Sequence, residues 1–199
     1  MARKIFFSFH HERDAWRAGQ VRNSGVIATE DERGFIDAAD WEEIKREGDA
    51  AIEAWIREQL KGTSVTVVLI GAETSKRPWV VHEIRESWEC GNAIVGLYIH
   101  NVKNQESETD TKGANPLDTI YLKNGQALST VCKTFDWVLN DGRINLGTWA
   151  EEAFKVREEY EGETALKSGT LDEWSPSHQK PYAPAGPTII KNPSGPWAP

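Results

Sequence analysis

The chain has 199 residues, a formal net charge of −8 and two cysteines, and this length predicts one domain of roughly 150 residues plus an appendage. The negative charge and the lack of a long Lys/Arg run argue against nucleic acid as the main partner, and no apolar run approaches the ~20 residues that span a membrane. Cys90 and Cys132 have no metal-like spacing, which favours a reducing, cytoplasmic setting.

Strands and helices are predicted to alternate from the start of the chain. Residues 5–9 form an apolar run typical of a first strand. A helix is expected near residues 14–21, followed by a loop over residues 23–34. A short second strand is expected at residues 34–37, and residues 41–44 are expected to form a turn of helix.

The middle of the chain carries the clearest patterns. An apolar stripe with helical spacing predicts the next helix: Ile52, Trp55, Ile56 and Leu60. Asp49 is its expected N-terminal cap and Gly62 its expected left-handed end. Val65–Ile70 has the β-branched run of a central parallel strand, and residues 93–99 form a similar run. Residues 78–91 between them predict a second amphipathic helix.

Towards the C-terminus the pattern weakens. Residues 101–115 are polar and are expected to form a long surface loop, and residues 130–136 are expected to form the last strand, at the sheet edge. Thr148 followed by Glu151 has the capping-box pattern that opens a helix. The alternation as a whole predicts an α/β fold: a doubly wound parallel sheet of four to five strands with helices on both faces.

The end of the chain differs in composition. Seven of the nine prolines lie from Trp174 onward, where no helical period is found, so we expect an extended arm or a disordered tail. We therefore divide the chain into a domain over residues 1–160 and a Pro-rich C-terminal extension over residues 161–199.

Trp79 and Glu83 are the main candidates for function. They are four residues apart in the helix after Val65–Ile70, so they lie on one face of it, near the sheet edge where ligands bind in open α/β sheets. The simpler alternative is a solvated helix glutamate. A carboxylate at this edge can orient a ribose hydroxyl and stabilise positive charge on the sugar, as N-glycosidic cleavage requires.

Other candidates would line the same crevice. Ser8, Phe9 and His10 end the first strand, where Phe9 could stack on a base and the other two could bond phosphate or ribose. The alternative is that Phe9 belongs to the core and His10 is exposed. Asp37 and Trp41 could reach the crevice rim, or be a helix cap and a core aromatic. The sequence has no Gly-rich phosphate loop, no nucleophile elbow and no His-based metal pattern.

Six short segments resemble, in the same order, the TIR-like proteins of the Thoeris anti-phage system. They are residues 3–10, 63–71, 79–84, 91–96, 113–118 and 136–138. The resemblance covers roughly residues 3–150. The family's catalytic glutamate, in its Trp-x-x-x-Glu context, falls on Glu83. The resemblance places further residues around the substrate: Ser8, Phe9, His10, Asp37, Trp41 and Trp79.

This resemblance implies a flavodoxin-like TIR fold and NAD as substrate, with neither a separate cofactor nor a metal. Such proteins sense phage infection, release nicotinamide and make an ADP-ribose-derived signal, often cyclic. The implied partners are NAD, an effector protein reached through this diffusible nucleotide, and a phage-derived trigger. A homo-oligomer is also compatible with the family, and neither nucleic acid nor a membrane is expected.

Two alternatives to an NAD-consuming enzyme remain open from the sequence. One is a non-catalytic TIR scaffold that pairs with other TIR surfaces, although a scaffold has no need of a carboxylate in the crevice. The other is an enzyme like the nucleoside deoxyribosyltransferases, which share the fold class and a catalytic glutamate. Nicotinamide release from NAD and base release from deoxynucleosides would separate the three.

Overall fold

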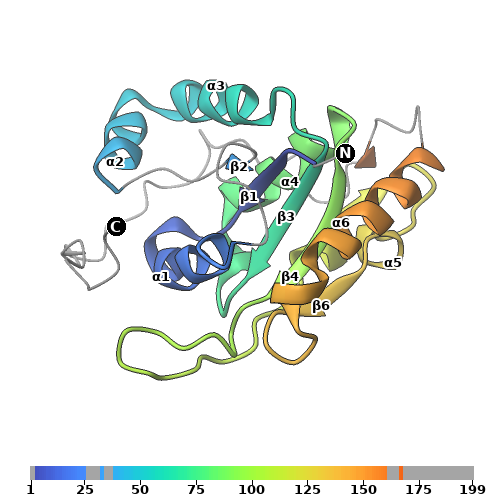
Figure 1. Ribbon diagram of the computed structural model, residues 1–199. Helices are drawn as coiled ribbons and strands as arrows, with labels where there is room; N and C mark the ends of the chain where they lie inside the picture. Colours follow the sequence, from blue (N-terminus) through green and yellow to red (C-terminus); the bar gives the residue numbers. More distant parts are fainter. Residues whose placement is uncertain (1–2, 26–31, 34–37, 161–165, 168–199) are drawn as a thin grey trace.

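The computed structural model describes residues 3–25, 32–33, 38–160 and 166–167, and in these ranges a parallel sheet lies between helices on its two faces (Figure 1). The strands of this sheet are β1 (Ile5–Ser8), β2 (Glu32–Arg33), β3 (Val65–Ile70), β4 (Ala93–Tyr98) and β6 (Thr134–Asp136). The α-helices are α1 (His11–Arg22), α2 (Ala38–Glu47), α3 (Asp49–Leu60), α4 (Pro78–Glu89), α5 (Leu128–Val131) and α6 (Gly142–Glu158). None of the helices in the described ranges is long and apolar enough to cross a bilayer.

The strand order is β2-β1-β3-β4-β6, and all neighbours are parallel. In chain order this is 2-1-3-4-5, the flavodoxin-like arrangement, which confirms the predicted fold class. The chain turns from β1 towards one edge of the sheet and from β3 towards the other. The crevice outside the carboxyl ends of β1 and β3 is therefore the switch point at which such sheets bind ligands.

The pleat of β1 assigns its side chains to the two faces of the sheet. Phe7 packs in the core cluster that α1 and α6 cover. Phe6 packs in a separate cluster with α2 and α3, which includes Trp41 and Ile56. Because side chains two apart in a strand share a face, Ser8 lies on the same face as Phe6. This face also carries α4.

The predicted core strands are confirmed. Every residue of Val65–Ile70 is buried, and this strand pairs over its whole length with β4. The glycine expected after α3, Gly62, has a φ of +74°, in the left-handed region. Asp49 is the first residue of α3 rather than its cap, which is Gly48.

Three predicted elements begin or end at other residues than expected. The helix expected near residues 14–21 begins earlier, at His11. The second strand is found at Glu32–Arg33, inside the expected loop, while residues 34–37 lie outside the described residues. The last strand covers only Thr134–Asp136, because the first two residues of the predicted strand belong to α5 and the next residue is in a bend.

The capping-box prediction at Thr148 was wrong. The helix α6 starts at Gly142, so Thr148 lies inside it and is exposed. The tertiary structure fixes the earlier start, because the ring of Trp137 lies on Gly142, where an added Cβ would come within 2.3 Å of the indole. A carboxylate oxygen of Asp136 also accepts bonds from the N–H groups of the two residues after Trp137.

The Pro-rich extension lies mostly outside the described residues. Its described part is β7 (Leu166–Lys167), which pairs antiparallel with β5 (Tyr121–Leu122). The arm predicted from Trp174 onward lies outside the described residues. The structure therefore gives no outcome for that prediction.

The loop over residues 101–115 is confirmed as a long connection, and it lies beside α1 (Figure 1). The buried Arg17 of α1 donates from Nε to the carbonyl oxygen of Val102 at 2.8 Å. Its Nη1 lies 3.6 Å from Asp110, which also accepts two bonds from Arg13. The loop is thus fixed to α1 by buried and partly buried charge.

We expect Arg17→Met to lower the free energy of unfolding by about 2–4 kcal/mol, because it removes a buried charge-assisted hydrogen bond and leaves Asp110 less well paired. Urea denaturation followed by circular dichroism measures the change. Arg143→Met, at an exposed position of α6, is the matched control and should change stability by about 0.5 kcal/mol or less. Equal losses in the two variants would contradict the assigned role of Arg17.

Candidate active site

Glu83 lies in the second turn of α4 and is only 1% exposed. The helix begins at Pro78, whose missing N–H costs nothing at a first helical position. The hydroxyl of Ser8, at the end of β1, donates to Oε2 of Glu83 at 2.5 Å. Ser8 is itself fully buried. The structure therefore joins the two ends of the predicted site, one from the strand and one from the helix.

Burial raises the pKa of Glu83 to about 8, and the bond from Ser8 acts in the opposite direction. The direction follows from desolvation, which disfavours the charged form of a carboxyl. In the described part of the chain, Glu83 forms no salt bridge. At neutral pH the carboxyl is thus mostly protonated in this conformation.

His10 follows β1 and caps the start of α1 through its backbone alone. It was expected to be exposed or substrate-binding, and it is 7% exposed. Within the described residues, both of its ring nitrogens lack a hydrogen-bond partner. Burial, followed by the positive charge of Arg77, lowers its pKa to about 4, so its ring is neutral at pH 7.

Phe9 and Trp41 are core aromatics in this conformation, the simpler of the two readings left open for each. Phe9 belongs to the cluster covered by α1 and α6, whereas Trp41 belongs to the cluster of α2 and α3. His11 joins them, because its ring stacks on Trp41 at 4.7 Å and lies 4.2 Å from the ring of Phe9. A substrate role for Phe9 or Trp41 stays a prediction.

Trp79 is partly buried and packs against the cluster that contains Trp41. Its ring meets His82 edge-on at 5.6 Å. Asp37, the remaining predicted residue, lies outside the described residues. The structure thus brings Ser8 and Glu83 into contact and places Trp79 beside the aromatic cluster.

Two residues near the crevice were missed by sequence reasoning. The sequence pattern did not single out His11, whose pKa is lowered to about 3 by burial and, second, by its neighbour His10. Asp14 is fully buried against Gly71, where a Cβ would come within 2.2 Å of Oδ2. Burial raises the pKa of Asp14 to about 6. The glycine directly after β3 was the sequence signal for this close approach.

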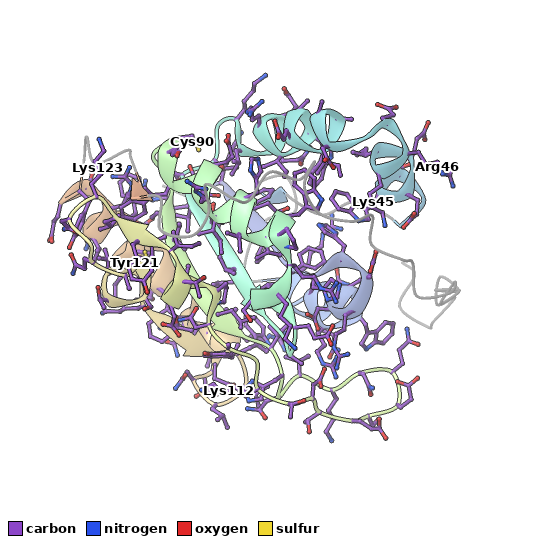
Figure 2. All side chains as sticks on the ribbon, turned by 180° about the vertical axis from the view of Figure 1, so that it is seen from behind. Lys45, Arg46, Cys90, Lys112, Tyr121 and Lys123 are labelled. Atoms are coloured by element: carbon purple, nitrogen blue, oxygen red, sulfur yellow. The ribbon has the colours of Figure 1, made fainter. Side chains whose placement is uncertain are left out.

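The cations around the crevice are paired with carboxylates. Lys45 of α2 (Figure 2) lies 3.1 Å from Glu12 of α1 and also contacts Glu42. Arg77 donates to Glu73 at 2.7 Å. Within the described ranges no group of three or more His, Cys, Asp or Glu side chains could hold a metal ion. Lys45 and Arg77 are therefore both held in ion pairs.

Comparison with known proteins identifies the family. Residues 6–104 match the family described as Thoeris protein ThsB, TIR-like domain. The chain is also 32% identical over 190 residues to a protein of Bacillus cereus (strain MSX-D12) named "Putative cyclic ADP-D-ribose synthase ThsB1". That alignment covers 75% of this chain and 99% of the relative. The chain belongs to the Thoeris ThsB family of TIR-like proteins.

The burial of Glu83 makes a prediction for stability. The folded-state pKa of about 8 lies above the ordinary value of 4.5, so the stability that this group contributes is complete below pH 4.5 and is lost as pH rises through 8. Glu83→Gln keeps the shape of the protonated form and escapes this loss. The variant should therefore gain about 3 kcal/mol over wild type between pH 4.5 and pH 7.

Urea denaturation of both proteins at pH 4.5, 6 and 7.5 measures that gain. Glu86→Gln is the matched control, because Glu86 lies one turn further along α4, is partly exposed and pairs with Arg57. A difference between wild type and Glu83→Gln that stays constant with pH would contradict the account of the buried carboxyl.

Proposed function

We propose that this ThsB-family chain is an anti-phage enzyme that cleaves NAD at the bond between nicotinamide and ribose. The product would be an ADP-ribose-derived, cyclic signalling molecule that activates a partner effector. One observation carries the proposal: a buried carboxyl, Glu83, held by Ser8 at the switch point of a flavodoxin-like sheet. The name of the Bacillus cereus relative supports a cyclic ADP-ribose product.

The chemistry requires one carboxylate. In NAD the nicotinamide ring is already cationic, so it leaves as a neutral molecule, takes the bonding electrons and needs no acid. The ribose then carries positive charge, as in the oxocarbenium-like transition state of glycosidases. The ionised form of Glu83 would hold a ribose hydroxyl and stabilise that charge. Such electrostatic stabilisation is strongest in a site with little water.

Exclusion of water favours a cyclic product over a hydrolysed one. If Glu83 and Ser8 are as shielded from water with NAD bound as they are in the described conformation, few water molecules can reach the ribose carbon that loses nicotinamide. A nucleophilic oxygen or nitrogen of the same ADP-ribose can then form the new bond to that carbon. If the nucleophile is a hydroxyl, its proton is lost to solvent or to a neighbouring base.

The start of α1 suits the diphosphate of NAD. The N–H groups of the first helical residues, His11 and Glu12, have no partner within their helix, and such helix starts favour anions. The two ring nitrogens of His10 lie at the same end of the helix without a hydrogen-bond partner in the described part of the chain. These groups support a contact with phosphate oxygens.

Incubation with NAD tests the proposal. Wild type should release nicotinamide, detected by liquid chromatography, and yield a cyclic ADP-ribose species by mass spectrometry. Glu83→Gln should lower the rate about a hundredfold or more, the usual effect of removing one preorganised electrostatic contact. Glu86→Gln, the same change on the same helix, should keep the wild-type rate.

The assay is run on purified protein and on lysates of phage-infected cells, because Glu83 is shielded from solvent in the described conformation. Nicotinamide release by Glu83→Gln at the wild-type rate would exclude the assigned role. Release of free base from deoxynucleosides, with NAD left intact, would favour the deoxyribosyltransferase alternative.

A non-catalytic scaffold is the second candidate, and the same burial favours it. A carboxyl that is 1% exposed and mostly protonated at neutral pH can be a structural group between α4 and β1. On that reading neither purified protein nor infected-cell lysate would consume NAD. Protection of cells from phage would then survive Glu83→Gln.

A further inference from the structure

We propose that the cationic nicotinamide ring of oxidised NAD is the counter-ion of Glu83, and that its binding expels the proton that this carboxyl carries in the free protein. The inference rests on the proposed function and adds a basis for choosing oxidised over reduced dinucleotide. The site would recognise the positive charge of the oxidised nicotinamide ring, which the reduced ring lacks.

The geometry that carries this inference is a buried carboxyl without a cation. Buried carboxyls in proteins are normally paired with a cation or a metal, because desolvation of the anion is costly. Glu83 is 1% exposed, and its hydrogen bond comes from the neutral hydroxyl of Ser8. Across the described ranges, no Lys, Arg or His nitrogen lies within 4.0 Å of its oxygens.

Several charged groups on α3 and α4 pair with one another. Arg57 of α3 contacts Glu53 of its own helix and Glu86 of α4. His82 of α4 faces the same Glu86 at 4.0 Å. These contacts therefore form a network between α3 and α4 that does not include Glu83.

The groups at the sheet edge also provide no cation for Glu83. Arg77, which precedes α4, contacts Glu73. His10 after β1 is neutral at pH 7 because burial lowers its pKa. Asp14 lies against Gly71 in the next loop. The strands β3 and β4, which also pack on α4, contain no charged residue.

A bound cation would reverse the balance that keeps Glu83 protonated. With a pKa of about 8, about nine tenths of the carboxyls carry a proton at pH 7. An opposite charge within about 4–6 Å favours the anion. Binding of oxidised NAD at pH 7 should therefore release about 0.9 proton per site. The dihydronicotinamide ring of NADH is neutral and should release none.

Isothermal titration calorimetry in phosphate and in Tris at pH 7 measures this release, because the two buffers differ in ionisation enthalpy. The oxidised probe is carba-NAD, which keeps the cationic ring but has a methylene group in place of the ribose ring oxygen, so its glycosidic bond resists cleavage. Carba-NAD should show the buffer dependence of about 0.9 proton, and NADH should show none and bind at least tenfold more weakly.

Variants assign the proton to its residue. Glu83→Gln should abolish the buffer dependence, whereas Glu86→Gln, at the partly exposed neighbour on α4, should keep it. Ser8→Ala removes a bond that favours the anion. At pH 8, where wild type should release about half a proton, this variant should release more.

Equal proton release with NADH, release that survives Glu83→Gln, or failure of carba-NAD to bind at millimolar concentration would each overturn the inference. Nicotinamide release from NAD is measured in parallel. Cleavage of NAD without buffer-dependent binding would support the proposed function and contradict the inference about the proton of Glu83. Buffer-dependent binding without cleavage would keep the cation site and remove the enzymatic activity.

Discussion

A buried carboxyl bonded to one hydroxyl is the constraint on which the rest of the site depends. Glu83 and Ser8 come from α4 and β1 and meet where no water competes for their bond. Burial strengthens the electrostatic effect that the carboxylate has when it is ionised. The same burial favours the protonated form as long as no positive charge lies nearby. In the proposed mechanism, reactivity and latency would therefore have one physical cause, which is the low polarity around these two side chains.

Two of the predicted substrate-binding residues, Phe9 and Trp41, are parts of the hydrophobic core. Phe6 of β1 and Trp41 of α2 belong to one cluster with residues of α3. The ring of His11 contacts both Trp41 and Phe9, and Phe9 belongs to the cluster on the other face of the sheet. Arg17 holds the loop over residues 101–115 against α1. A substrate that contacts Phe9 or Trp41 would thus contact side chains that also stabilise the fold. Movement at the site would be coupled to the packing of α1 and α2.

The sequence predicted the sheet better than it predicted the ends of the helices. Val65–Ile70 is recognisable because a strand covered on both faces must be apolar at every position. The start of α6 was misplaced because a capping box reports only local preference. The contact of Trp137 with Gly142, which sets that start, depends on packing across the turn. The pairing of Glu32–Arg33 with β1 likewise has no apolar pattern to reveal it.

By itself, the sequence determined the fold class, the family and the position of Glu83 beside Trp79 on the helix after the central strand. The fold class and the helix position of Glu83 follow from periodicity and spacing, whereas the family follows from the resemblance of six short segments to known proteins. Only the tertiary structure decided that Ser8 bonds to Glu83, that Asp14 lies on Gly71, and that the carboxyl has no cation beside it in the described part of the chain. Burial and the identity of a partner depend on residues far away in the chain, 75 positions for Ser8 and Glu83, so no local pattern can encode them.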